Sequence, residues 1–87
     1  MRIGIEAQRI FRQKKHGMDF VVLELIRELQ HIDLENEYFI FVNEGPDNKV
    51  IKETANFKIN IIYDFNEDNT LPVLNEIKDN AMEIHKY

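Results

Sequence analysis

The chain has 87 residues, 44% of them apolar and 31% charged, which is the size and composition of one small globular domain and excludes a disordered segment. The absence of cysteine excludes disulfides and thiolate metal sites and suits a reducing cytoplasm, where we expect the protein to be located. The net charge of −5 argues against broad nucleic-acid binding, and no apolar run is long enough for a transmembrane segment.

The chain begins with a strand pattern followed by a basic loop. Apolar and other residues alternate from Ile3 to Ala7, as in a β-strand. Residues 8–16 are polar and basic, and we expect Ile10 and Phe11 to anchor this loop. Residues 1–16 hold five of the 11 Lys and Arg residues but only one of the 16 acids, so positive charge is concentrated here.

The clearest pattern predicts a helix over residues 17–32. Apolar residues recur at helical spacing at Met18, Val21, Val22, Leu25, Ile26, Leu29 and Ile32. Asp19 lies in the first turn and His31 in the last, each on the side that the helix dipole favours, His31 in its charged form. This pattern predicts one continuous apolar face.

The remaining segments alternate between strand and helix patterns. Residues 38–42 are aromatic or branched without alternation, which is typical of a strand covered on both faces. A turn at 45–48, a short helix at 50–54, a strand at 57–63 and a last helix at 70–84 follow. We therefore expect one α/β domain over residues 1–87, a three-stranded parallel sheet with flanking helices that forms half of a Rossmann-like doubly wound domain.

The basic loop and the glycine after it form a candidate anion site. Gly17 would let a phosphate approach the backbone at the helix start, where N–H groups point outward, and His16 is adjacent. The possible anion contacts are Arg9, Arg12, Lys14 and Lys15. The alternative interpretation is a solvated basic loop in which Gly17 supplies only its backbone angles.

Other chemistry finds little support in the sequence. Glu6 and Asp64 follow the first and third strands and could hold Mg²⁺ as in receiver domains, but the further strands of that fold are missing. The three histidines lack metal-ligand spacing, and we place His31 and His85 at helix ends on the surface. Without serine or cysteine, no nucleophile and base can be paired. We predict no catalytic residue, metal or cofactor.

Three blocks resemble the start of family 4 (group 1) glycosyltransferases. They are residues 1–11 (MRIGIEAQRIF), 15–19 (KHGMD) and 35–43 (ENEYFIFVN). The resemblance implies a GT-B enzyme with two Rossmann-like domains, which transfers a sugar from a nucleotide-sugar donor to a glycan or lipid-linked acceptor in polysaccharide biosynthesis. It also implies that His16, Gly17 and Met18 lie at the cleft, where they meet the donor's phosphates.

The same resemblance implies that the donor-binding domain is absent from this chain, so we expect a fragment that is inactive by itself. In such a fragment the first strand would have an unpaired flank. We therefore expect a homo-oligomer through this exposed sheet edge, with first strands pairing across a two-fold axis. The alternative is a small self-associating α/β binding or scaffold module without catalysis.

Overall fold

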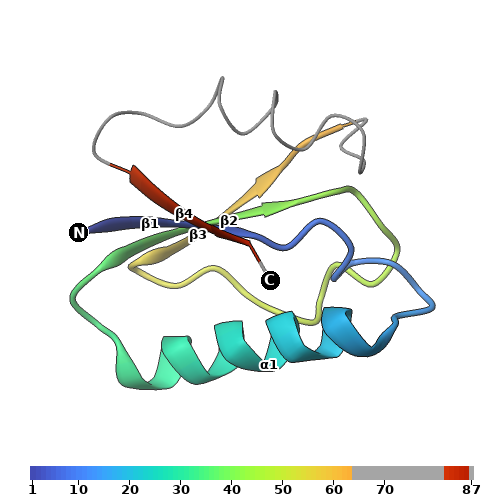
Figure 1. Cartoon of the computed structure of the whole chain (residues 1–87), viewed down its shortest axis with the longest axis horizontal. Helices are drawn as coiled ribbons and strands as arrows, with labels where there is room; N and C mark the ends of the chain where they lie inside the picture. Colours follow the sequence, from blue (N-terminus) through green and yellow to red (C-terminus); the bar gives the residue numbers. More distant parts are fainter. Residues whose placement is uncertain (64–81, 87) are drawn as a thin grey trace.

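The described part of the fold is a four-stranded parallel sheet with one helix along one face (Figure 1). The computed structural model describes residues 1–63 and 82–86. Within them the elements are β1 (Arg2–Glu6), α1 (Gly17–Ile32), β2 (Glu37–Val42), β3 (Phe57–Ile61) and β4 (Met82–Lys86). The strand order is β3-β2-β1-β4, which matches the first four positions of the doubly wound order 3-2-1-4-5-6.

The fourth strand corrects the sequence prediction of three strands and a helix reaching residue 84. Met82 and Ile84 alternate with Glu83 and His85, which is the period of a strand, and β4 pairs in parallel with β1. The helix prediction failed here because Ile84 also continues a helical spacing that begins at residue 74. The rest of that predicted helix, over 70–81, lies outside the described residues.

Strand β1 is therefore internal. Glu6 lies opposite Phe41 of β2 on one side and opposite Lys86 of β4 on the other. The predicted unpaired flank of β1 is wrong because β4 occupies it, so first strands cannot pair across a two-fold axis. Within the described residues the outer strands are β3 and β4. Self-association itself stays a prediction.

The core lies between the sheet and α1. Ile26 of α1 and Ile40 of β2 are completely buried. On the same face, the rings of Tyr38 and Phe57 stack with centroids 4.2 Å apart. This face is made by alternate residues of the strands, as the register of β1, β2 and β3 requires.

Helix α1 has the predicted bounds, and its buried face, which includes the predicted Val22 and Ile26, matches the predicted stripe only in part. Met18, Val21 and Ile32, which the sequence pattern placed in the apolar stripe, are 55%, 54% and 69% exposed. Leu23 and the carboxylate of Asp19 are buried instead. The buried face is therefore shifted towards Asp19, whose carboxylate has a partner in the basic loop.

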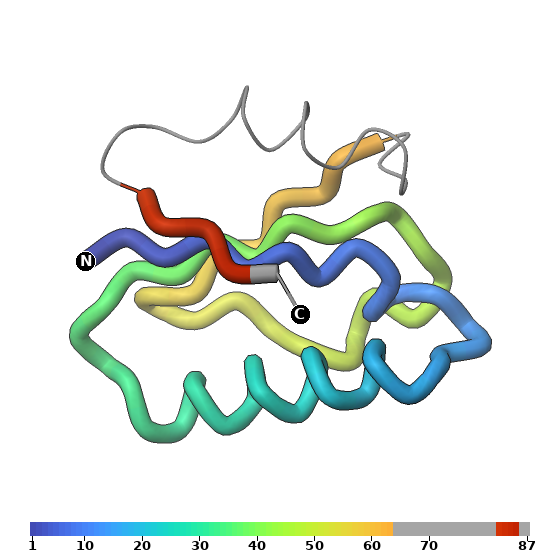
Figure 2. The backbone as a smooth tube through the Cα atoms, viewed as in Figure 1, coloured from blue at the N-terminus to red at the C-terminus, as the bar shows by residue number. Residues whose placement is uncertain are grey.

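The connection from β2 to β3 contains no helix, so the predicted short helix at 50–54 is wrong. Figure 2 shows this segment lying between the sheet and α1. The Ile51 side chain is buried in the core. Arg27 of α1 donates to the Val50 carbonyl oxygen (3.0 Å, Nη2) and Gln30 donates to that of Lys52 (2.8 Å). These helix side chains provide the hydrogen bonds that a helix backbone would otherwise supply.

A cluster of hydrogen bonds joins the end of α1 to the start of β2. The Asp33 N–H donates to the Leu29 carbonyl oxygen (2.9 Å) and ends the helix. The Asp33 carboxylate accepts bonds from the Tyr38 hydroxyl (2.6 Å), the Asn36 N–H and side-chain amide, and the Glu35 N–H. The Tyr38 hydroxyl, followed by the Asn36 and Glu35 donors, holds the pKa of Asp33 well below its usual range.

Candidate functional site

The loop after β1 is held firmly at the carboxyl edge of the sheet. The Ala7 N–H donates to the Phe41 carbonyl oxygen (2.8 Å), and the Asn43 N–H donates to that of Gln8 (2.9 Å). Ile10 and Phe11 are 1% and 2% exposed, which confirms that they anchor the loop. The loop therefore has a fixed path between the end of β1 and the start of α1.

Asp19 organises the start of α1. Its Oδ2 accepts the His16 N–H at 2.8 Å, which is one half of a capping box. The same oxygen accepts the Nε–H of Arg12 at 2.7 Å and lies 2.6 Å from Arg12 Nη2. The Asp19 side chain is only 9% exposed, so its charge is compensated by this guanidinium and by the helix N-terminus.

Lys15 also has its charge matched within the chain. Its Nζ forms an ion pair with the Asp47 carboxylate and donates to the Arg12 carbonyl oxygen at 3.0 Å. The Lys15 side chain is only 5% exposed. Of the four predicted anion contacts, Arg12 and Lys15 are thus paired with carboxylates, and an incoming anion would compete with Asp19 and Asp47 for them.

The other two cations lie in different settings. Lys14 is exposed, and Arg9 is half-buried in the wall of a small hollow between the end of β1 and the first turn of α1. Glu6 and Met18 also line this hollow, whose volume is about 40 Å³. A cavity needs about 10–15 Å³ of such volume to hold one water molecule, so the hollow has room for a small polar group.

Gly17 opens α1 at the exposed surface, with His16 and Met18 exposed on either side of it. Its φ angle lies outside the left-handed region, and a Cβ at this position would meet no described atom within 4 Å. Neither backbone conformation nor close packing among the described residues therefore requires glycine here. The structure does not support the alternative interpretation, in which Gly17 supplies only its backbone angles.

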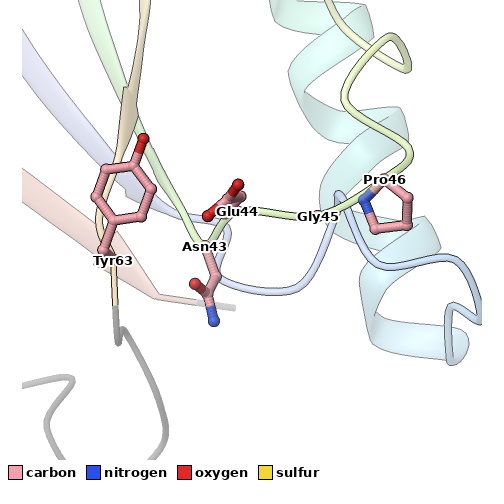
Figure 3. Close-up of a pocket in the computed structure, with 5 residues that line it drawn as sticks. All are labelled: Asn43, Glu44, Gly45, Pro46 and Tyr63. Atoms are coloured by element: carbon pink, nitrogen blue, oxygen red, sulfur yellow. The ribbon is translucent and has the colours of Figure 1, made fainter.

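A second hollow lies at the ends of β2 and β3 (Figure 3). It has a volume of about 510 Å³ and is lined by Asn43, Glu44, Gly45, Pro46 and Tyr63. Tyr63 is 70% exposed. Sequence analysis missed this hollow because its walls come from two segments about 20 positions apart, each following a different strand.

His85 is a further polar residue that the sequence interpretation misplaced. It lies in β4 opposite Ile5, not at a helix end, and its Nε2 is 3.3 Å from Glu83 Oε1. The alternation of residues 82–86 was the pattern that could have placed it in a strand. Asp64, the partner proposed for Glu6 at a metal site, lies outside the described residues. Among those described, no three His, Asp or Glu side chains are placed to hold a metal.

Within the described residues, the strand order is that of an open parallel α/β sheet. From β1 the chain moves to β2 and β3 on one side, and β4 lies on the other, so the order reverses between β1 and β4. Ligands of such sheets bind outside the carboxyl ends of the strands at this reversal. No family model, curated protein or solved structure matches the chain significantly. In the described part of the chain, no helix has the length and apolarity needed to span a membrane.

Proposed function

We propose that this chain forms the start of the acceptor domain of a nucleotide-sugar-dependent glycosyltransferase of the GT-B type, in which the start of α1 contacts the donor's phosphates. The reaction would transfer a sugar to a glycan or lipid-linked acceptor. The proposal rests on the resemblance of three sequence blocks and on the strand order β3-β2-β1-β4, which fits a Rossmann-like domain. The chain alone would not be catalytic, since the donor domain implied by the resemblance would supply the remaining contacts.

The observation that carries the proposal is the unexplained glycine at the start of α1. A Cβ at Gly17 would meet no described atom within 4 Å, and this residue lies at the helix end that carries partial positive charge. Glycine at such a position is useful when a ligand must approach the backbone closely. The neighbouring end of β1 lies at the reversal of strand order, where ligands of this fold class bind.

A second candidate is a binding or scaffold module without catalysis. The observation favouring it is the internal pairing of Arg12 with Asp19 and of Lys15 with Asp47. These pairs give two of the basic residues a structural role, so part of the positive charge needs no ligand to explain it.

The two candidates differ in what a nucleotide sugar does to the amides of α1. We expect a uridine-diphosphate sugar to shift the Gly17 and Met18 amide resonances, with a Kd of about 1 mM or weaker because only one side of the cleft is present. Inorganic pyrophosphate should shift the same amides, since it carries the anionic group that a helix N-terminus binds. The measurement is a two-dimensional NMR titration of the 87-residue chain.

The matched variant is Gly17→Ala. Because the added methyl group meets no described atom within 4 Å, the variant should fold and should be more stable by about 0.5–1 kcal/mol, the usual gain of alanine over glycine in a helix. Ligand-induced shifts should nevertheless fall strongly. Equal shifts in both proteins, or none in the original chain at about 10 mM ligand, would instead favour the module without catalysis.

A further inference from the structure

We infer that β4 is a self-association strand, which pairs antiparallel with β4 of a second copy in a register centred on Ile84. This inference is independent of the ligand site at the start of α1. It replaces pairing of the first strands, which the structure rules out because β1 is internal. The product would be one continuous sheet with α1 of both copies on the same face, because a two-fold axis normal to a sheet preserves its faces.

The two outer strands of the described sheet differ in how their edges are protected. At β3, the Glu53 carboxylate accepts the Ile59 N–H at 3.2 Å, so a side chain already satisfies an edge donor. Lys58, next to the central Ile59 of β3, is exposed and carries a charge of the kind that discourages edge pairing. In β4 the central residue is the apolar Ile84, which is half-buried and packs near Gly4. Of the two edges, β4 is therefore better suited to pairing with its own copy, because a side chain already binds an edge donor of β3, whereas Glu83 and His85 of β4 attract each other.

Geometry limits the registers that two copies of β4 can adopt. Residues directly opposite each other in an antiparallel pair point to the same face, and side chains alternate with a period of two. A two-fold pair must therefore be centred on a residue. The three central choices are Glu83, Ile84 and His85, and only Ile84 aligns all five residues of Met82–Lys86 with their counterparts.

Charge selects the same register. Centring on Ile84 places Glu83 of each copy opposite His85 of the other, so a carboxylate acceptor faces an imidazole donor twice. These two residues already interact within one strand at 3.3 Å. Centring on Glu83 would instead oppose two carboxylates, and centring on His85 would oppose two imidazoles. Opposite groups that attract stabilise a sheet, and like charges destabilise it.

Cysteine cross-linking can determine the register between the two β4 strands, because the chain has no cysteine of its own and each introduced thiol is the only one per copy. In Ile84→Cys the two thiols would lie opposite each other, at the Cα separation that a disulfide needs. In Met82→Cys, the control on the same face, they would be offset by four residues, or about 13 Å along the strand, beyond disulfide reach. We expect at least about tenfold more covalent dimer from Ile84→Cys under mild oxidation at equal concentration.

The unmodified chain, two charge variants of β4 and one control variant of β3 test the pairing of β4 strands without a disulfide. Sedimentation of the original chain should show a dimer. Glu83→Lys should raise the dimer dissociation constant about tenfold, because both facing pairs then lose their acceptor. The double change Glu83→Lys with His85→Glu should restore dimerisation. Lys58→Glu, the matched control at the β3 edge, should leave dimerisation unchanged. A monomer at every concentration, stronger cross-linking at position 82, or disruption by Lys58→Glu alone would overturn the inference, once circular dichroism has shown that each variant folds.

Discussion

Replacing Gly45 by alanine should remove a large part of the stability of the chain. A Cβ at this position would lie 2.6 Å from the carbonyl carbon of Phe11 and 3.0 Å from its Cβ. Phe11 cannot move easily, since it is 2% exposed and its carbonyl oxygen accepts the Asp47 N–H at 2.9 Å. Overpacking against a fixed backbone costs about 3 kcal/mol, against a total of about 4–13 kcal/mol for a chain of this length.

Urea denaturation measures this effect, and Gly17→Ala provides the control. Both variants add one methyl group to a glycine, but only Gly45 has backbone atoms in the way. The midpoint should fall for Gly45→Ala and stay or rise for Gly17→Ala, with similar m-values if both remain two-state. Equal midpoints would mean that the loop after β2 does not approach Phe11 as closely as the structure has it.

Much of the fold could be predicted from local patterns. The apolar period of residues 17–32 gave α1 with its bounds, and the apolar run at 38–42 gave β2 to within a residue. These elements are long or strongly patterned, so their local and tertiary preferences agree. The shift of the buried face of α1 was not predictable from the same pattern. It places Asp19 beside Arg12, a residue that precedes the helix and whose position requires the folded loop.

The errors have similar physical causes. Ile84 fits both a helical spacing and a two-residue alternation, and only its pairing beside β1 decides between them. The segment over 50–54 has weak helical character, and hydrogen bonds from Arg27 and Gln30 hold it in another conformation. Strand β3 ends at residue 61 and not at 63, since its partner β2 ends at Val42, opposite Ile61. Contacts distant in sequence determine each of these outcomes.

The candidate site was predictable in location but not in its internal pairing. The strand, basic loop and helix start were expected to meet at the carboxyl edge, and they do. The pairing of Lys15 with Asp47 brings together residues 32 positions apart, which no local pattern reveals. The block at 35–43, one of the three that carry the resemblance, begins at the opposite, amino-terminal edge of the sheet. Its Asn36 and Tyr38 serve the Asp33 cluster, so they bear on the fold and not on ligand binding.

Asp33→Asn should destabilise the chain strongly at neutral pH. The Asp33 carboxylate accepts four hydrogen bonds, which join the end of α1 to Tyr38 at the start of β2. An asparagine offers one acceptor oxygen in place of two and carries no charge. Glu35→Gln is the control, because it removes an exposed carboxylate in the same turn while the Glu35 N–H keeps its bond to Asp33.

The destabilisation caused by Asp33→Asn should be largest at neutral pH and should decrease as the pH falls. These hydrogen bonds lower the pKa of Asp33 in the folded chain below its ordinary value of 3.8, so the folded state binds this proton less readily than the unfolded state. The stabilisation is therefore complete above the ordinary pKa and is lost as the pH falls below it. Urea denaturation at about pH 7 and about pH 3 measures the free energy of unfolding of both proteins. The difference in this free energy between the original chain and Asp33→Asn should be smaller at the lower pH. If the difference in the free energy of unfolding stays constant or increases at low pH, the charge of Asp33 does not hold this end of α1 against β2.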